Sequence, residues 1–478
     1  MRVLTPFDMF ADDARLSLLV TIGSALGLSL LAWYATSRAK STTKINAHKV
    51  HTLENRHYLF GDMKEMGENA ERLHKWLLER SLHFNGEPWR FYLPGIMDTT
   101  VITTPELVEE MLATQADIFI RGKVTNDMSE DMLGKSLISS DGPKWYHQRK
   151  AVAKFFSARA LRKCMQVHLR KNVGQLNGVL DRAAQDGTPL ERWLNIGPER
   201  KINTAMRASR AWLNKAVPES LAAFAAQRQA RAEAGDTTDN DVKSMIELFL
   251  EQVDEDTEGL RAEDLPEVVL TLVIGSRGTS ATSLTWYFLL MTKYPEIEQK
   301  VRDEMKSLLP NFGDDSYVSG DQLNKLVYLE ATIKEMLRLY PAIPLNQRIA
   351  DADTIIGGSI QVKKGDNFFL PTYAMARLPT IWGPDAAEYK PERWIDADTG
   401  ELISYPGSMF QTFSTGARHC LGMRLAMLEM RVAIANILKR YRFTLAQPCV
   451  LDHKFSNELH PAQPLVFNFT RNALTPAA

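Results

Sequence analysis

The chain has 478 residues, of which 45% are hydrophobic, so it can bury a large core in one body or in a few smaller ones. Its formal net charge of −1 gives no global electrostatic reason to expect a nucleic-acid partner. Three cysteines (Cys164, Cys420 and Cys449) form neither an even framework nor a CxxC pair, which argues against a disulfide scaffold and against a cysteine-rich zinc site.

The N-terminal part of the chain predicts a membrane anchor. Residues 16–37 contain no charge and include Trp33 and Tyr34, and 22 residues of helix are long enough to cross the hydrocarbon layer of about 30 Å. Basic residues follow this segment and acidic residues precede it, which favours a cytosolic position for the rest of the chain over a cleaved signal peptide. We therefore expect a lumenal segment at 1–15, a single-pass signal anchor of the endoplasmic reticulum membrane at 16–37, a basic linker at 38–56 and one catalytic body at 57–478.

The body is predicted to be mainly α with small β-sheets. β-branched and aromatic residues predict strands within 90–104, and Gly357-Gly358 predicts a hairpin turn within 354–371. Helical periodicity and flanking prolines predict helices at 104–113, 145–168, 264–294, 321–340 and 422–440. The longest of these is expected to begin after Asp264 as N-cap and to end before Pro295.

The loop FSTGARHCLG, residues 413–422, combines the residue types that present a reactive sulfur. Gly416 and Gly422 permit a close approach of the backbone to a flat ligand. Arg418 and the N-terminus of the following helix both favour the thiolate form of Cys420. A thiolate is a strong donor to iron, and a single axial thiolate is one way in which haem is held. The alternative interpretation is a buried cysteine in a glycine turn.

The loop and three further motifs resemble one family. Phe413-x-x-Gly416-x-Arg418-x-Cys420-x-Gly422 is similar to the complete haem-binding signature of the cytochrome P450 family. Along the chain, WYHQR (145–149), EMLR (335–338) and YKPERW (389–394) resemble the WxxxR motif, the ExxR motif and the PERF-type segment of the same family, in the family's order. The resemblance covers the whole chain after the anchor and implies the cytochrome P450 fold.

The resemblance also implies a set of roles. Cys420 is expected to be the axial ligand of the iron of haem b and a catalytic residue. Glu335 and Arg338 lie three apart on one helix and can pair, and Arg393 is expected to complete a buried structural network with them. The remaining residues expected to contact the haem or its propionates are Trp145, Arg149, Arg348, Phe413, Arg418 and Gly422.

The long helix contains a departure from the family pattern. In GSRGTSATSLTW (275–286), Thr279 corresponds to the catalytic threonine of the family and Arg277 to its arginine, whereas Gly278 stands where an acidic residue is usual. Thr279, Ser280 and water remain available to relay protons. The alternative for Thr279 is a helix hydroxyl bonded to a carbonyl one turn back. Loss of the acid leaves slower hydroxylation, or an oxygen-independent isomerase or dehydratase, as open alternatives.

The resemblance implies a monooxygenase that inserts one oxygen atom of O2 into an apolar organic substrate. Residues 373–394 look most like fungal alkane and fatty-acid hydroxylases, and oxidation of a secondary metabolite is an equal alternative. Ile343 and Leu345 are expected to line the substrate pocket. Electrons are expected from NADPH through cytochrome P450 reductase, with cytochrome b5 as an additional donor, docking on a face that includes Lys150 and Arg424.

One spacing favours a third function. Thr279 follows Arg149 by only 130 residues, which is short for a microsomal member and leaves little chain for the helices that cover the substrate. A haem-binding protein without catalysis is therefore also consistent with the sequence.

Overall fold

The computed structural model describes residues 50–156, 166–191 and 264–472, with interruptions at 55, 96, 124, 128–133, 135, 187–189, 310–311 and 313–314, and six isolated positions between 215 and 233. The expected lumenal segment, the anchor at 16–37 and most of the linker lie outside the described residues. So does most of the interval between the motif at 145–149 and the long helix. Among the residues that are described, no helix combines the length and the apolar character needed to cross a membrane.

A six-stranded mixed sheet forms one part of the body, with the strand order β1-β2-β3-β9-β6-β4. Its strands are β1 (His51–Thr52), β2 (Trp89–Leu93), β3 (Met97–Val101), β4 (Phe119–Ile120), β6 (Asn346–Ala350) and β9 (Asn367–Leu370). Side chains of β2 alternate, with Trp89, Phe91 and Leu93 buried, as the two-residue period of a strand requires. Because β1 pairs with β2, the folded body already includes His51 and Thr52, which lie inside the segment expected to be a linker.

Both regions predicted to contain strands are confirmed. Residues 90–104 form the antiparallel pair β2 and β3. Residues 354–371 form the hairpin of β7 (Thr354–Ile356) and β8 (Ile360–Val362), followed by β9. Gly357 and Gly358 have φ angles of +57° and +69°, the left-handed region that the hairpin turn needs. A third sheet has the order β10-β11-β5, with β10 (Tyr441–Leu445), β11 (Val466–Arg471) and β5 (Leu190–Glu191).

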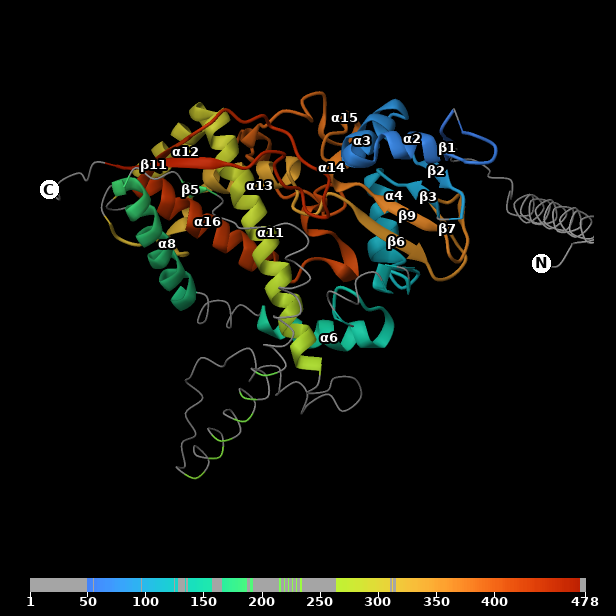
Figure 1. Ribbon diagram of the computed structural model, residues 1–478, viewed down its shortest axis with the longest axis horizontal. Helices are drawn as coiled ribbons and strands as arrows, with labels where there is room; N and C mark the ends of the chain where they lie inside the picture. Colours follow the sequence, from blue (N-terminus) through green and yellow to red (C-terminus); the bar gives the residue numbers. More distant parts are fainter. Residues whose placement is uncertain are drawn as a thin grey trace, which may run out of the picture. The chain divides into compact units, whose positions relative to one another are not determined.

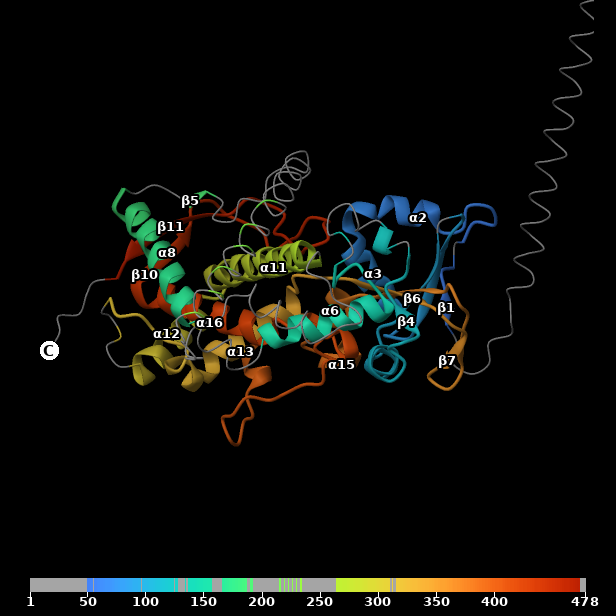
Figure 2. The same cartoon turned by 90° about the horizontal axis from the view of Figure 1, so that it is seen from below.

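Helical residues far outnumber strand residues in the described body, so the predicted class, mainly α with small sheets, is confirmed. The helices are α2 (Met63–Glu68), α3 (Leu73–His83), α4 (Pro105–Glu109), α6 (Gly142–Phe155), α8 (Gln166–Asp186), α11 (Leu265–Lys293), α12 (Pro295–Leu308), α13 (Val327–Leu339), α14 (Thr372–Met375), α15 (Pro379–Trp382) and α16 (Met423–Arg440). Figures 1 and 2 show α8, α12 and α16 at one end of this body and the six-stranded sheet at the other, with α11 between them.

The long helix α11 changes character along its length. Its C-terminal half is apolar, and residues 286–291 are all buried against α12, α13 and α16. Its middle, around Gly275, Ser276 and Arg277, is exposed. Burial of the apolar half, at about 25 cal/mol per Å2 of apolar surface, fixes the helix in the body. Gly278 and Thr279, which are partly exposed, lie between this exposed segment and the buried half.

Predicted helix ends agree with the structure where capping signals are local. The helices predicted at 264–294 and 422–440 are confirmed as α11 and α16. The carboxylate of Asp264, however, lies 3.1 Å from Lys144 Nζ instead of capping α11.

The helix predicted at 145–168 is wrong in its bounds. The chain enters α6 at Gly142, with φ +64°, and Pro143 occupies its first turn, so the helix begins three residues early and ends at Phe155. The helix predicted at 321–340 is divided by Leu326 into the 3-10 helix η5 (Gln322–Lys325) and α13.

Candidate functional site

The Cys420 loop is held in a single shape by its backbone. It runs from the 3-10 helix η7 (Gln411–Phe413) through η8 (Gly416–Arg418) to the start of α16. The Cys420 N–H donates to the Phe413 carbonyl at 2.8 Å, which closes the loop on itself. Gly416 has φ +66°, and a Cβ there would lie 1.8 Å from the Leu112 carbonyl oxygen, so only glycine fits.

Ser414 shows that this shape is strained. Its φ of +59° and ψ of −176° belong to a region that is essentially restricted to glycine. Its hydroxyl is buried and has no hydrogen-bond partner among the described residues. Contacts on both sides hold it there, because the Thr412 hydroxyl donates to the Leu337 carbonyl at 2.7 Å and Gly416 packs against Leu112. The fold therefore tolerates local strain at this loop in order to keep the geometry of the sulfur.

The sulfur of Cys420 is placed where an anion is stabilised. The Cys420 side chain is open to solvent. Crowding by surrounding protein atoms nevertheless raises the pKa of its thiol, while the N–H groups of Gly422 and Met423 and the guanidinium of Arg149 lower it. Those two N–H groups belong to the start of α16, whose macrodipole also favours a negative charge. A cation bound directly to the sulfur would tip this balance to the thiolate.

A cluster of arginines adjoins the loop. Arg348 is 1% exposed, and burial together with the charges of Arg121 and Arg418 lowers its pKa to about 9. Burial, Arg121 and Arg149 lower the pKa of Arg418 to about 10, although Asp141 opposes the shift. Asp141 accepts hydrogen bonds from the Arg418 side chain and from the backbone N–H groups of Arg121 and Gly122.

The charges of this cluster do not cancel. Asp141 is the single carboxylate that acts on Arg121, Arg348 and Arg418 among the described contacts of these arginines. The Nε atoms of Arg121 and Arg348 are buried and have no hydrogen-bond partner among the residues that the structure describes. Two positive charges and two buried donors are thus left over. Buried charges are normally paired, so this arrangement is suited to a ligand that carries two negative charges.

Arg149 and Trp145 on α6 adjoin the same cluster. Arg149 donates to the His419 carbonyl at 2.9 Å, so it lies directly beside the Cys420 loop. The guanidinium carbons of Arg418 and Arg149 lie 4.3 Å and 5.7 Å from the centre of the Trp145 ring. Such cation–π contacts orient both arginines. The structure thus brings together Cys420 and four of the residues expected to hold haem propionates, namely Trp145, Arg149, Arg348 and Arg418.

The residues present therefore fit a haem. A soft thiolate donor flanked by two N–H groups suits the iron, and an excess of two buried positive charges suits two propionates. A glycine that no other residue can replace keeps the loop in position.

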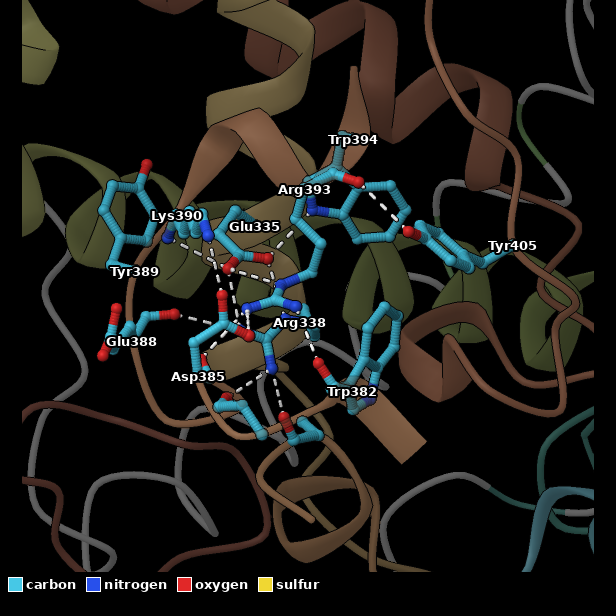
Figure 3. A network of polar contacts seen from close by, with 12 residues as sticks. Glu335, Arg338, Trp382, Asp385, Glu388, Tyr389, Lys390, Arg393, Trp394 and Tyr405 are labelled. Carbon is cyan, nitrogen blue, oxygen red and sulfur yellow. Dashed lines mark hydrogen bonds and ion pairs between the residues drawn. The ribbon is translucent and has the colours of Figure 1, made fainter. Parts of the chain in front are cut away.

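The carboxylate of Glu335 lies at the centre of a buried network that supports this loop (Figure 3). Glu335 is 0% exposed and receives two parallel hydrogen bonds of 2.7 Å from Arg338. It also accepts from the Lys390 backbone N–H at 3.0 Å, from Arg393 Nε at 3.4 Å and from Trp394 Nε1 at 2.9 Å. Both arginines and the indole N–H thus satisfy one carboxylate, as a buried charge requires.

The two arginines of this network bind several carbonyl groups of the connecting segment. Arg338 donates to the carbonyls of Ala386 at 2.7 Å and Glu388 at 3.1 Å, and Arg393 donates to that of Trp382 at 2.8 Å. Because the Leu337 carbonyl of α13 also accepts from Thr412, the network connects the segment 376–394 to the helix that holds the Cys420 loop.

Other candidate residues are placed as follows. The Thr279 hydroxyl donates to the Gly275 carbonyl at 2.7 Å, the helix-internal bond that the sequence left open as an alternative. Ile343 is 37% exposed, whereas Leu345 is half-buried against the core around Phe91. Lys150 and Arg424 are both exposed.

Sequence reasoning missed Arg121 and Asp141. The pairing of β4 with β6 brings Arg121, which follows β4, beside Arg348. No local signal marks this pairing, since about 230 residues separate the two strands. Asp141, immediately before α6, could have been recognised as a candidate cap but not as the partner of Arg418.

Fold and site together define a haem-thiolate class of protein, and comparison with known proteins agrees. The family model described as cytochrome P450 matches residues 52–195 and 186–466. The chain belongs to the cytochrome P450 family, whose members are haem-containing oxidoreductases.

Three relatives illustrate the range of similarity. The chain is 26% identical to the cytochrome P450 monooxygenase cyp1 of Mycosarcoma maydis, over 74% of this chain and 64% of the relative. It is 30% identical to the alkane hydroxylase MAH1 of Arabidopsis thaliana, over 54% of this chain and 49% of the relative. It is 25% identical to cytochrome P450 704C1 of Pinus taeda, over 94% of this chain and 96% of the relative.

Proposed function

We propose that the protein is a haem-thiolate monooxygenase that holds haem b through the thiolate of Cys420. The observation that carries the proposal is the excess of two buried positive charges beside a cysteine whose sulfur receives two N–H groups. Arg121, Arg348 and Arg418 would neutralise the two propionates, and Arg149 would hold the loop in place through His419. Phe413 and Gly422 would shape the backbone around the sulfur.

When bound, the haem would activate O2 for insertion of one oxygen atom into a C–H bond. Cys420 supplies electron density through its thiolate. The Glu335–Arg338–Arg393 network keeps the segment 376–394 and the cysteine loop in register and takes no part in the reaction. Thr279 belongs to the exposed middle of α11, where its hydroxyl can exchange a helix-internal hydrogen bond for one to water or substrate.

The substrate is proposed to be apolar, either a fatty acid or alkane or a secondary metabolite. The similarity to an alkane hydroxylase over 54% of this chain supports the first of these. The side chain of Ile343, which follows α13 and is exposed, would contact such a substrate. Leu345 packs instead against the sheet core and would act as support.

Electrons are proposed to come from NADPH through cytochrome P450 reductase, with cytochrome b5 as an additional donor. The exposed cations Lys150, on α6, and Arg424, at the start of α16, lie on the two helices beside the Cys420 loop and would attract an acidic partner. Residues 16–37 would anchor the protein in the endoplasmic reticulum membrane, with 1–15 in the lumen and the body in the cytosol.

A carbon monoxide difference spectrum of the reduced protein tests the proposal. The wild-type protein should show the absorption of thiolate-ligated haem, and Cys420→Ser should lose it. Cys449→Ser is the matched control, because Cys449 is a buried thiol distant from the loop in the chain, and its spectrum should not change. A wild-type protein that binds no haem, or a Cys420→Ser variant with the wild-type spectrum, would refute the assignment.

Gly278 on α11 favours one second candidate, an oxygen-independent haem isomerase or dehydratase, because α11 carries no acid at this position. The two functions differ in their need for reductant. A monooxygenase consumes O2 and, through the reductase, NADPH. An isomerase turns over without O2 and without NADPH.

A further inference from the structure

A carboxylate lies against Gly278 although α11 itself has none there. A Cβ built on Gly278 would lie 2.4 Å from Glu458 Oε1 and 3.0 Å from both Glu458 Cδ and Oε2. Real Cβ atoms essentially never approach other atoms within 3.0 Å. The glycine thus leaves the space that the Glu458 carboxylate occupies, and a side chain at 278 would require the end of the Glu458 side chain to move.

The backbone of this segment is fixed against α11. Glu458 belongs to the connection between β10 and β11. The indole of Trp286 on α11 donates to the Leu459 carbonyl, and the Leu459 N–H donates to the Ala342 carbonyl at 3.0 Å. These contacts hold the residue that follows Glu458 on both sides. The backbone that carries Glu458 is therefore set by the fold, and the carboxylate itself is held by Thr282 and His460.

Hydrogen-bonding groups lead from Glu458 toward the surface. The Thr282 hydroxyl lies 3.2 Å from Glu458 Oε2 and 3.1 Å from His460 Nδ1. His460 Nε2 lies 3.6 Å from Glu458 Oε2, and the His460 side chain is 14% exposed. Thr282 lies one turn after Thr279 on α11, and Gly278 immediately precedes Thr279. The carboxylate thus contacts the same turn of α11 that carries Thr279.

The surroundings of Glu458 favour its protonated form. Burial raises the pKa of Glu458, and the hydrogen bond from Thr282 opposes this shift only in part. Burial also lowers the pKa of His460, with Lys454 acting in the same direction, so this imidazole is neutral more readily than a free histidine. A raised pKa makes a carboxyl better suited to hold a proton and to donate it.

We propose that Glu458 is the proton-relay carboxyl for the α11 turn that carries Thr279, supplied by the β10–β11 connection in place of an acid on the helix. The inference rests on the proposed monooxygenase function. In that reaction one O–O bond breaks, one oxygen atom enters the C–H bond of the substrate and the other leaves as water. Two electrons from NADPH and two protons complete the water. Glu458 passes these protons to Thr279 or its water and is reprotonated through Thr282 and His460.

A stability cycle tests the geometry without any turnover. Gly278→Ala should lower the melting temperature of the haem-loaded protein, because the new methyl group displaces the Glu458 carboxylate from Thr282 and His460. In the Glu458→Ala background the same change should raise it, because alanine favours the helix over glycine. Equal shifts in both backgrounds would show that the carboxylate does not lie against Gly278 and would overturn the proposal.

A kinetic experiment tests the relay. With NADPH, reductase and dodecanoic acid as the probe, Glu458→Gln should slow O2 consumption by about 100-fold, the lower end of general acid–base contributions. It should also enlarge the solvent deuterium isotope effect. The relocation variant Gly278→Asp with Glu458→Ala should recover most of the rate, because it returns a carboxyl to the same place from the helix. A merely structural role of Glu458 would not give that rescue.

Glu429→Gln is the matched control. Glu429 is another partly buried carboxyl with a raised pKa and accepts a hydrogen bond from Ser280 of α11 at 3.3 Å, but it comes from α16. The proposal is overturned if Glu458→Gln leaves the rate and the isotope effect unchanged, or if Glu429→Gln is the variant that slows O2 consumption. A wild-type protein with the spectrum of thiolate-ligated haem that consumes no O2 refutes the monooxygenase function instead, and the stability cycle still decides the geometry.

Discussion

Replacing Glu335 by alanine tests whether the buried network holds the fold around the cysteine loop. In wild type the carboxylate is shared by Arg338, which is 1% exposed, and Arg393, whose side chain is 9% exposed. Removal of Glu335 leaves the buried guanidinium of Arg338 with carbonyl acceptors but no carboxylate, whereas Arg393 keeps its ion pair with Asp385 at 2.7 Å.

The expected loss is large relative to the whole stability. Breaking a buried ion pair by removing one partner costs about 3–5 kcal/mol, and the Trp394 indole N–H loses its acceptor as well, at about 1–3 kcal/mol. Because domains are stable by only about 5–15 kcal/mol, Glu335→Ala should unfold a sizeable fraction of the protein or abolish its haem loading.

Glu330 provides a matched control on the same helix. Its side chain is 22% exposed and pairs with Lys334 at 3.5 Å and Arg431 at 3.0 Å. Pairs of this kind contribute about 0–1 kcal/mol, so Glu330→Ala should have a small effect. Urea unfolding followed by circular dichroism, with the haem absorbance recorded in parallel, measures both variants. Equal losses for Glu335→Ala and Glu330→Ala would refute the argument from burial.

Three further predictions concern the loop and its surroundings. Ser414→Gly should raise the free energy of unfolding by about 1 kcal/mol. Relief of backbone strain contributes about 1–3 kcal/mol and exceeds the ~0.5–1 kcal/mol that glycine costs in chain entropy. Thermal unfolding measures the change, and a lower melting temperature of the variant would contradict the prediction. Arg348→Met should speed haem loss to apomyoglobin by about 10- to 100-fold, because it removes a charged hydrogen bond worth about 1.5–3 kcal/mol. An unchanged rate of haem transfer would show that Arg348 binds no propionate. Hydrogen bonds from Lys390 and Arg393 lower the pKa of Asp385 from 3.8 to about 2, so its contribution to stability is present above pH 3.8 and is lost as the pH falls toward 2. Acid titration of unfolding should therefore be less steep in this range for Asp385→Asn, and identical slopes would exclude the contribution.

The parts of the site that depend on contiguous motifs could be predicted from the sequence. Residues 413–422 carry the cysteine, its glycines and its arginine within one loop, and Glu335 and Arg338 are neighbours on one helix. The ends of α11 and α16 were predicted closely, although the Asp264 side chain does not cap α11. The start of α6 was missed because the left-handed Gly142 and Pro143 determine it, and both precede the predicted start at 145.

The charge balance of the site could not be predicted in the same way. Arg121 becomes part of the arginine cluster only because β4 pairs with β6, and strand pairing across more than two hundred residues leaves no local trace in either segment. The same holds for Asp141, whose identity as the partner of Arg418 depends on how α6 meets the cysteine loop. Sequence therefore specifies which groups can hold haem, while the excess of positive charge that favours haem emerges from the assembled sheet and helices.

Gly278 shows how a local pattern can mislead about chemistry. Read along α11 alone, glycine in place of an acid indicates a weakened or altered reaction. In three dimensions the absence of a side chain at 278 is what admits the Glu458 carboxylate, since a Cβ would lie 2.4 Å from it. Charge at a site is determined by distance and burial and not by the element that carries the residue, so a carboxyl 180 residues away in the chain can take the same position. The glycine at 278 and the acid at 458 are then one feature of the protein. Gly278→Ala or Glu458→Ala alone should therefore lower the melting temperature more than the two changes together.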